Sequence, residues 1–256
     1  MSLLHFVLIN FFLMGYDMPK VKRNKNSIHF SNMTGKLKGL RAISTNTITN
    51  PFCIKMSNSK KDNVICKKCY SFDMLKTYRK NMQDCLQHNS ELLSNSIIDD
   101  VHLPFIIDAY IRIDAHGELI NDTHLINIYN LAIKNPHTTF AIWSKRKDIV
   151  NSVSKIVDTP SNVILIFSNA IIDDVSYEPP KHFHKVFNNV SDTHKEKEQN
   201  CTGQICVECM ACYKLDSGIN VIIEAEKKNG RTIKSKVKDN NSSRRDKLDA
   251  IDKQWD

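Results

Sequence analysis

Glycine is scarce in this sequence, with seven glycines among 256 residues. The sequence contains no Gly-rich phosphate-binding loop, no Gly-x-Ser-x-Gly nucleophile elbow and no His-Glu-x2-His segment. Because a phosphate cradle needs glycines for close backbone approach, their scarcity argues against a nucleoside-triphosphate site. The other two absences remove the usual signals of an α/β-hydrolase and of a zinc protease.

No run of apolar residues is long enough to cross a bilayer, which takes about 20 residues. The most apolar stretch, residues 3–14, contains His5 and Asn10 and is not preceded by basic residues as a signal peptide would be. We expect this stretch to form a hydrophobic β-strand or to lie upstream of the true start codon, at Met14 or Met18. The sequence therefore predicts a cytoplasmic protein without membrane contact.

The charge of the chain is biased toward basic residues. The sequence has 36 Lys and Arg against 28 Asp and Glu, a formal net charge of +8, with basic clusters at residues 19–25 and from Lys227 onward. Such a bias permits contact with nucleic acid without establishing it. Terminal basic runs are more often solvated tails, and we expect residues 227–256 to form a loosely ordered one.

Cysteine, in contrast, is abundant. Of eight cysteines, seven fall in two tight groups and only Cys85 stands apart. A disulfide-stapled secreted domain usually spreads its cysteines over a shorter chain, whereas gaps of two residues indicate metal or cluster ligation in a reducing compartment. We expect Cys85 to be a buried structural thiol, because a continuous helix would place it more than about 20 Å from Cys69.

The first cysteine group consists of Cys53, Cys66 and Cys69, and a predicted helix begins at its second pair. The free N–H groups of a helix N-terminus favour thiolates and an anionic cluster. Three thiolates can bind three irons of a 4Fe–4S cubane and leave the fourth iron open to a substrate or cofactor. The alternative is a zinc site completed by His88 or His116, which the spacing alone favours.

The second cysteine group is Cys201-x4-Cys206-x2-Cys209-x2-Cys212. A zinc ribbon places two ligand pairs on separate knuckles, because four ligands must surround one small ion tetrahedrally. Consecutive two-residue gaps instead wrap a loop around a larger cubane, as in bacterial ferredoxins. This group predicts a complete four-ligand 4Fe–4S site, with zinc as the alternative.

Apolar and β-branched runs alternate with helical patterns along most of the chain. The expected strands are 105–113, 138–143, 162–167, 185–188 and 219–224, and the expected helices are 69–94, 122–134 and 145–157. Apolar strands that alternate with helices predict an α/β fold with a parallel sheet, and their spacing suits a partial (β/α) barrel. The predicted parts are an N-terminal extension (1–27), the partial barrel (28–195), a cysteine-rich segment with the last strand (196–226) and the tail (227–256).

Several short motifs accompany the cysteines. In chain order they are Thr34-Gly35-Lys36-Leu37, Asn50-Pro51, Ile111-Arg112-Ile113-Asp114-Ala115-His116-Gly117-Glu118-Leu119, Asn135-Pro136 and Phe140-Ala141-Ile142-Trp143-Ser144-Lys145. Together with the cysteines they resemble the phage gene-product-88 domain proteins, which are small radical S-adenosylmethionine-like iron–sulfur proteins. The resemblance covers roughly residues 30–225.

The resemblance implies a partial (β/α) barrel of the radical S-adenosylmethionine type with a C-terminal cysteine-rich, cluster-binding segment. It implies that the three-cysteine cluster binds S-adenosylmethionine and, after one-electron reduction, cleaves it to a 5′-deoxyadenosyl radical. Flavodoxin or ferredoxin would supply the electron, in the host cytoplasm if the chain is phage-encoded. The usual Cys-x3-Cys-x2-Cys spacing is stretched here to twelve residues in the first gap.

Polar residues near the ends of the predicted strands are candidates for holding this cofactor. By the resemblance, Glu118 would contact its amino group, with Gly117 allowing close backbone approach. The full candidate set is Arg112, Asp114, Gly117, Glu118, Ser144, Lys145 and Ser168. The alternatives are a solvated Glu118 in an ordinary turn, a structural ion pair between Arg112 and Asp114, and helix capping by Ser144.

Three hypotheses about function follow from these observations. The first is a radical S-adenosylmethionine-like enzyme with an auxiliary 4Fe–4S cluster. The second is a non-catalytic protein of the same fold whose clusters are structural or redox-sensing, with nucleic acid as a partner. The third is a two-site zinc protein acting as a binding module. No motif identifies a substrate or a catalytic residue.

Overall fold

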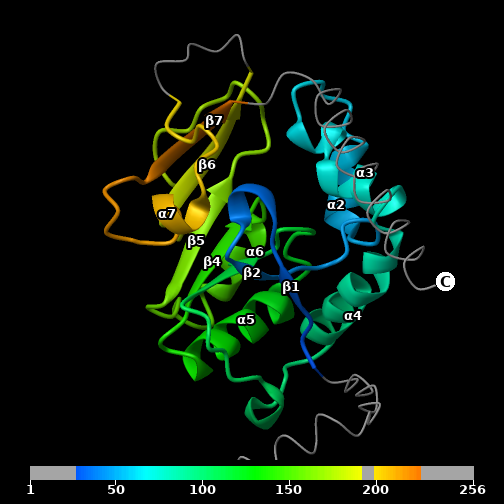
Figure 1. Cartoon of the computed structure of the whole chain (residues 1–256), viewed down its shortest axis with the longest axis vertical. Helices are drawn as coiled ribbons and strands as arrows, with labels where there is room; N and C mark the ends of the chain where they lie inside the picture. Colours follow the sequence, from blue (N-terminus) through cyan, green and yellow to red (C-terminus); the bar gives the residue numbers. More distant parts are fainter. Residues whose placement is uncertain (1–26, 192–198, 226–256) are drawn as a thin grey trace, which may run out of the picture.

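The computed structural model describes residues 27–191 and 199–225. Its centre is one open seven-stranded sheet in which the strand order follows the sequence (Figure 1). The strands are β1 (Phe30–Asn32), β2 (Arg41–Ile43), β3 (Tyr110–Ile113), β4 (Thr139–Ser144), β5 (Val163–Ser168), β6 (Lys185–Val190) and β7 (Val221–Ala225). Only β1 runs antiparallel to its neighbour, and β2 to β7 are parallel. The predicted α/β fold with a mostly parallel sheet is confirmed, and the open sheet is consistent with the predicted partial barrel.

Helices connect the strands. The α-helices are α2 (Pro51–Ser57), α3 (Tyr70–Lys76), α4 (Gln83–Ser94), α5 (Asp122–Lys134), α6 (Lys147–Val153) and α7 (Cys206–Cys209). Short 3₁₀ turns are η1 (Gly35–Leu37), η2 (Ile65–Lys68), η3 (Lys80–Met82) and η4 (Asp100–His102). Within the described ranges, no helix is long and apolar enough to cross a membrane.

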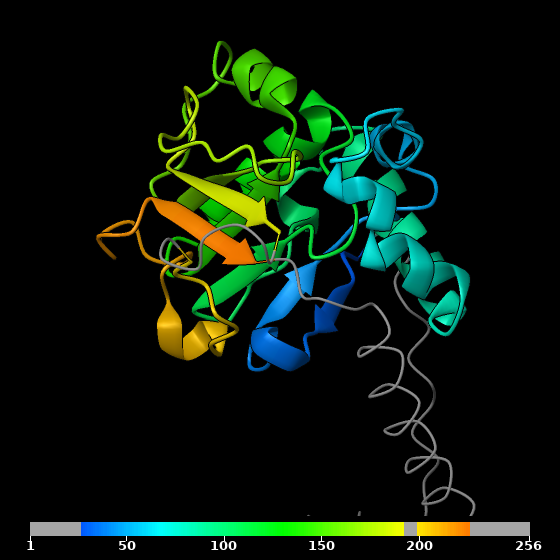
Figure 2. The ribbon, with the colours of Figure 1, turned by 90° about the horizontal axis from the view of Figure 1, so that it is seen from above.

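The parallel strands have two differently covered faces. On the outer face, side chains such as Ile111, Phe140 and Leu165 form the main core with α4, α5 and α6. On the opposite, inner face, Trp143 and Ile166 pack with Tyr213 from the cysteine-rich segment. Figure 2 shows this arrangement from above, with α7 and the outer helices on opposite sides of the sheet. The cysteine-rich segment therefore covers the inner face and contributes β7 to the same sheet.

Helix α5 agrees with its predicted range of 122–134. Asn121 caps its first turn, since the side-chain oxygen accepts a hydrogen bond from the backbone N–H of His124 at 3.0 Å. The predicted strands 138–143, 162–167, 185–188 and 219–224 correspond to β4, β5, β6 and β7, with shifts of one or two residues at most ends. Helix α6 is shorter than the predicted 145–157.

The predicted strand 105–113 is wrong over its first half. The side chains of Phe105 and Ile107 are 81% and 94% exposed, and β3 begins only at Tyr110. The backbone N–H of Ile106 donates instead to the side-chain oxygen of Asn135, at the end of α5 (2.7 Å). This segment therefore pairs with a helix end, and only Ile106 reaches the core.

The predicted continuous helix 69–94 is also wrong, because it divides into α3, η3 and α4. At Thr77 the backbone leaves the helical region, and the Thr77 hydroxyl donates to the carbonyl of Asp73 (2.6 Å). Gln83 then starts α4, and its side chain donates to the carbonyl of Leu75 (2.8 Å). The predicted distance from Cys69 to Cys85 assumed one straight helix and does not apply. Cys85 is half-buried on α4.

The predictions for residues 1–26 and for the tail from Lys227 onward lie outside the described residues.

Candidate functional site

The first cysteine group lies where β2, β3, β4 and β5 end, because parallel strands place their carboxyl ends at one edge. Cys53 lies in the first turn of α2, with Pro51 at the first helical position. The buried side chain of Asn50 accepts hydrogen bonds from the N–H groups of Phe52 (3.0 Å) and Cys53 (3.4 Å). Its amide donates to the carbonyl of Glu118 (2.9 Å), which ties the Cys53 turn to the loop after β3.

The other two cysteines of this group are brought to the same edge by a link to the end of β5. A bridge joins Val64 to Ile171, and the N–H of Ile65 donates to the carbonyl of Ala170 (2.9 Å). Cys66 then lies in η2, and Cys69 occupies the N-cap position of α3 without a side-chain capping bond. The unusually long gap after Cys53 thus lets the chain cross from the end of β2 to the end of β5.

The thiols of this group share one electrostatic environment. Burial raises the pKa of the Cys53 thiol, and the nearby Glu118 and Cys69 raise it further. Burial likewise raises the pKa of Cys66, while Lys145 acts to lower it. Although burial acts to lower the pKa of Lys145, all three thiols and Glu118 raise it overall. All three thiols therefore lie near enough to the half-buried Lys145 to act on its charge.

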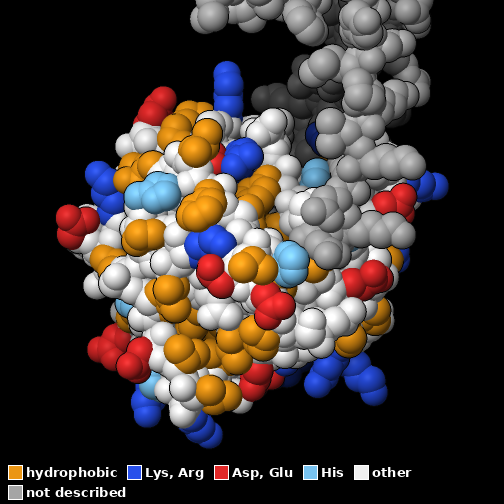
Figure 3. Space-filling view, turned by 90° about the horizontal axis from the view of Figure 1, so that it is seen from below, with side chains coloured by type: hydrophobic (Ala, Val, Ile, Leu, Met, Phe, Trp, Pro, Cys, Tyr) orange, Lys and Arg blue, Asp and Glu red, His pale blue; other side chains and the backbone are white. Residues whose placement is uncertain are grey.

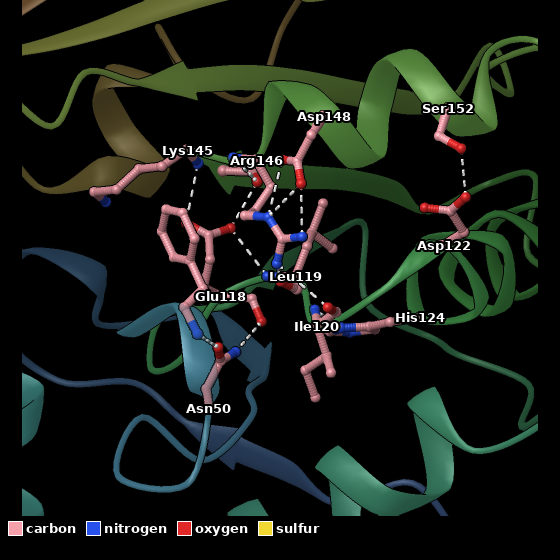
Figure 4. A network of polar contacts seen from close by, with 12 residues as sticks. Asn50, Glu118, Leu119, Ile120, Asp122, His124, Lys145, Arg146, Asp148 and Ser152 are labelled. Carbon is pink, nitrogen blue, oxygen red and sulfur yellow. Dashed lines mark hydrogen bonds and ion pairs between the residues drawn. The ribbon is translucent and has the colours of Figure 1, made fainter. Parts of the chain in front are cut away.

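Glu118 is the centre of a polar network at the ends of β3 and β4 (Figure 4). Its carboxylate accepts hydrogen bonds from the Ser144 hydroxyl (2.6 Å) and from the N–H groups of Leu119 and Lys145 (2.9 Å each). The side chain is 3% exposed, so the solvated-glutamate alternative is wrong. The Lys145 ammonium extends to the Ser168 hydroxyl (3.1 Å) and adds the end of β5 to the network.

Ser144 has a second contact. Its hydroxyl oxygen accepts a hydrogen bond from the N–H of Arg146 (3.0 Å), the residue before α6. Ser144 therefore satisfies one N–H at the start of α6, as the capping alternative predicted. It also belongs to the polar network, because its hydroxyl donates to Glu118.

Gly117 permits a close approach between two loops. Its φ is +88°, and an added Cβ would lie 2.1 Å from the hydroxyl oxygen of Thr45 and 2.6 Å from the carbonyl oxygen of Thr45. Its N–H donates to the hydroxyl of Thr47 (2.9 Å). The close approach expected at Gly117 is thus made to the loop after β2.

Asp114 is a buried carboxyl with only part of its hydrogen-bonding capacity used. Its Oδ1 accepts from the Thr45 hydroxyl (2.8 Å), whereas Oδ2 is buried and has no partner among the described residues. Burial raises its pKa well above the usual range, and Glu118 raises it further. The described ion pairs do not include Arg112 with Asp114.

Arg112 belongs to the neighbourhood of the second cysteine group. Its guanidinium carbon lies 3.2 Å from the centre of the Trp143 ring on the inner face. Its Nε is buried without a hydrogen-bond partner among the described residues. The buried hydroxyl of Tyr213 lies near the Arg112 guanidinium, which can only donate, so the hydroxyl proton has no acceptor among these residues. Arg112 also lowers the pKa of Cys206 and Cys212 against the effect of burial. Arg112 therefore lies beside the second group, although its charge still acts on Asp114.

The second group wraps around the start and end of α7. Met210 adopts a left-handed conformation (φ +57°) that ends the helix and returns the chain to the sheet. Cys206, Met210 and Cys212 then pack against the inner-face core. Cys201 is held to β7, since its N–H donates to the carbonyl of Ile223 (3.0 Å).

The four thiols of this group influence one another. Burial raises the pKa of Cys212 to about 12, and the other three thiols contribute in the same direction. Burial raises the pKa of both Cys201 and Cys206, and Lys36 acts in the opposite direction. The Lys36 ammonium is paired with Glu224 of β7 at 2.5 Å. Lys36 and Arg112 thus place two cations beside the four thiols.

The described residues contain no three His, Cys, Asp or Glu side chains spaced as ligands of one metal ion. The histidines considered for a zinc site have other contacts. The Nδ1 of His116 is hydrogen-bonded to the Ser71 hydroxyl (2.8 Å), and the Nε2 of His88 to the carbonyl of Ser27 (2.9 Å). Tyr70, which follows Cys69 directly, is 63% exposed.

Several residues of these sites were not assigned a role from the sequence. Asn50 had a detectable signal, because Asn-Pro before an apolar segment is typical of a helix start. Thr45, Lys36 and Tyr213 had none, since their roles depend on contacts between distant segments.

Comparisons of the chain with protein-family models, with curated proteins and with solved structures found no match. The resemblance to the phage gene-product-88 proteins therefore stays a prediction.

Proposed function

We propose that this chain is a radical S-adenosylmethionine-like protein with two 4Fe–4S clusters, one on Cys53, Cys66 and Cys69 and an auxiliary one on the four C-terminal cysteines. The observation that carries the proposal is the placement of the three cysteines at the edge where parallel α/β sheets bind their ligands, next to the hydrogen-bonded network of Glu118, Lys145 and Ser168. An open iron there would face the polar network around Glu118.

The donor set at the first site suits an anionic cluster. The thiols are half-buried, and in the apo protein their raised pKa keeps Cys53 and Cys66 protonated. Iron binding would deprotonate them, and Lys145 would then offset part of the negative charge. Three cysteines leave one iron position for a small molecule.

The second site also fits an anionic cluster. Buried donors without partners are uncommon and cost about 1–3 kcal/mol each. The Nε of Arg112 and the hydroxyl of Tyr213 are two such groups, and both lie beside the thiols of Cys206 and Cys212. Cluster sulfurs or thiolates there would give them acceptors.

When bound, the first cluster would supply the electron that cleaves a carbon–sulfur bond of S-adenosylmethionine. In this proposal Glu118 would bind the amino group of S-adenosylmethionine through Oε2. Among the described contacts this oxygen accepts only the N–H of Lys145, so it can accept a further hydrogen bond. Lys145 and Ser168, which are hydrogen-bonded to each other, would hold the carboxylate, and the unpartnered Asp114 Oδ2 would offer a further polar group.

A second candidate is a non-catalytic redox or structural protein of the same fold. One observation favours it: the cysteine-rich segment packs Tyr213 and Met210 onto the inner face of the sheet, where a barrel enzyme would hold its substrate. In this case both clusters would form, but S-adenosylmethionine would remain intact.

Anaerobic purification followed by iron analysis tests the first part of the proposal. We expect brown protein with about eight irons per chain. The triple variant C53S/C66S/C69S should retain about four irons, and the matched variant C85S should retain about eight. Colourless protein with two zinc ions would overturn the cluster assignment.

Adding dithionite and S-adenosylmethionine to the intact protein tests the second part. The radical-enzyme proposal expects 5′-deoxyadenosine, and this product should disappear in C53S/C66S/C69S. Intact S-adenosylmethionine in the presence of both clusters would reject catalysis and favour the non-catalytic candidate.

A further inference from the structure

The segment around the first cysteine group carries a concentrated positive charge. Residues 51–80 contain eight Lys and Arg side chains against two acidic ones, Asp62 and Asp73, for a net charge of +6. The whole chain of 256 residues has a net charge of only +8. The other described residues carry 12 Lys and Arg against 16 Asp and Glu, so within the described part of the chain the excess positive charge belongs to the segment that holds Cys53, Cys66 and Cys69.

All eight of these basic residues are exposed. Four of them, Lys60, Lys61, Lys67 and Lys68, lie between Cys53 and Cys69 in the sequence. Figure 1 shows α2 and α3 next to each other beside the strand ends, so these basic residues belong to one part of the molecule. We call residues 51–80 the basic lobe.

The basic lobe contains a surface hollow of about 350 Å³. Cys66 and Cys69 form part of its wall, together with Lys67 and Lys76 and the apolar side chains of Ile54 and Phe72. The first cysteine group is thus reached from the surface of the lobe. The second group differs, because Cys206 and Cys212 pack against the inner-face core.

The face of the molecule seen from below has mixed charge. Seen from below, Figure 3 shows acidic and basic side chains interspersed with hydrophobic ones. A partner that recognises charge would therefore find its strongest complement on the basic lobe.

We propose that the basic lobe is the docking surface for an acidic one-electron carrier protein that reduces the first cluster. This inference rests on the proposed function. Complementary charge would steer the carrier to the lobe, and the small interfaces of electron-transfer complexes suit a surface of this size. One electron would pass from the carrier, such as flavodoxin hydroquinone going to semiquinone, to the oxidised cluster behind Cys66 and Cys69.

A protein carrier fits the lobe better than a nucleic acid does. Single-stranded nucleic acid gains affinity from aromatic rings that stack on bases. The Tyr70 hydroxyl is hydrogen-bonded to the carbonyl of Ala115, and its ring packs against His116. The Phe72 ring has the Lys76 ammonium 4.6 Å from its centre. Tyr78, which is 54% exposed, is left as a ring that could stack on a base, and a single ring makes a poor stacking platform. The hollow also exposes the thiols of Cys66 and Cys69, which matters for electron transfer and not for binding a polyanion.

The test is the rate at which flavodoxin hydroquinone reduces the anaerobic holoprotein, followed by stopped-flow absorbance at several salt concentrations. The variant K60E/K61E reverses two exposed charges of the lobe. The control K155E/K181E makes the same change of net charge at two exposed lysines elsewhere. Dithionite, a small reductant that needs no docking surface, is used with every protein.

We expect the flavodoxin rate to fall by roughly tenfold or more between about 50 and 500 mM salt, because screening weakens steering. At low salt K60E/K61E should be slower by roughly tenfold, and K155E/K181E should stay within about twofold of the wild type. Equal rates for the two variants would overturn the docking surface.

The same experiment separates this inference from the proposed function. If dithionite reduces no cluster, the proposed function itself has failed. If dithionite reduces the cluster at the same rate in all proteins and the flavodoxin rate does not depend on the lobe charges, only the docking surface has failed. Salt-sensitive binding of single-stranded DNA, lost in K60E/K61E and without any flavodoxin effect, would assign the lobe to nucleic acid and reject the carrier.

Discussion

At the scale of single residues, the approach of Gly117 to Thr45 gives the sharpest stability prediction. In G117A, the new Cβ would overlap the Thr45 hydroxyl and carbonyl, and φ would stay at +88°. We expect the variant to lose about 2 kcal/mol or more of its free energy of unfolding, measured by urea denaturation.

The matched control for this variant is G203A. Gly203 has a similar φ of +98°, but no atom lies within 4 Å of the added Cβ. G203A therefore shows only the backbone strain, of about 1 kcal/mol. Equal losses in the two variants would contradict the argument that the contact with Thr45 is what requires glycine.

A second residue-scale prediction concerns His124, which is fully buried on α5. Burial lowers its pKa to about 4, so between this value and about 6.5 the unfolded chain binds a proton that the folded chain does not. The stability that comes from neutral His124 is complete above pH 6.5 and is lost as pH falls toward 4. The full loss would be about 3 kcal/mol.

H124N keeps an acceptor for the N–H of Ile120 but does not titrate in this range. The free energy of unfolding of H124N should therefore fall less steeply than that of the wild type between pH 6.5 and 4. H182N, at an exposed histidine, is the control and should follow the wild type. A wild-type slope in H124N would show that His124 is not the titrating group.

At the scale of elements, Asn50 both caps α2 and holds Cys53 in place. N50A removes the acceptor for the first N–H groups of α2 and the donor to the carbonyl of Glu118. We expect a loss of about 1–2 kcal/mol in stability and a fall from about eight irons toward four. Iron analysis and urea denaturation measure the two effects separately.

N121A is the control for this prediction, because Asn121 caps α5 through a bond of the same kind. Both variants should lose a similar cap energy, but N121A should keep its iron. If N121A lost as much iron as N50A, the effect would come from general destabilisation and not from the placement of Cys53.

The elements also show what the sequence could predict. Helix α5 has a strong cap at Asn121 and an apolar face, so both its ends were predictable from local signals. The break at Thr77 depends on side-chain bonds from Thr77 and Gln83 to neighbouring carbonyls, and the loss of strand at Phe105 depends on Asn135. These contacts compete with regular structure and leave no periodic pattern.

At the scale of the whole molecule, the sequence predicted the parallel sheet and the placement of Glu118 and Lys145 at its edge. It did not predict which side chains share a neighbourhood. Arg112 and Asp114 alternate along the chain, yet Arg112 stacks on Trp143 beside the second cysteine group, whereas Asp114 bonds to Thr45 beside the first. Arg112 and Asp114 have these different neighbours because Tyr213, from a distant segment, covers the inner face of the sheet.

The packing of the cysteine-rich segment on the inner face leads to a prediction for removal of the metal ligands. The chain after Cys212 is held to the sheet by the fully buried Lys185, whose ammonium donates to Ser217 (2.9 Å) and to the carbonyl of Ile219 (2.6 Å). The first cysteine group instead lies on helices outside the sheet. We therefore expect C206S/C212S to lose more global stability than C66S/C69S under anaerobic conditions.

The size of the difference follows from the unpartnered donors of the second site. Without a cluster, Arg112 Nε and the Tyr213 hydroxyl stay buried without acceptors, at about 1–3 kcal/mol each. C206S/C212S should thus fall below C66S/C69S by about 2 kcal/mol or more in urea unfolding, and the amide hydrogens of β7 should exchange faster. Equal losses in the two variants, with β7 still protected, would mean that the second group adds nothing to the sheet beyond its packing.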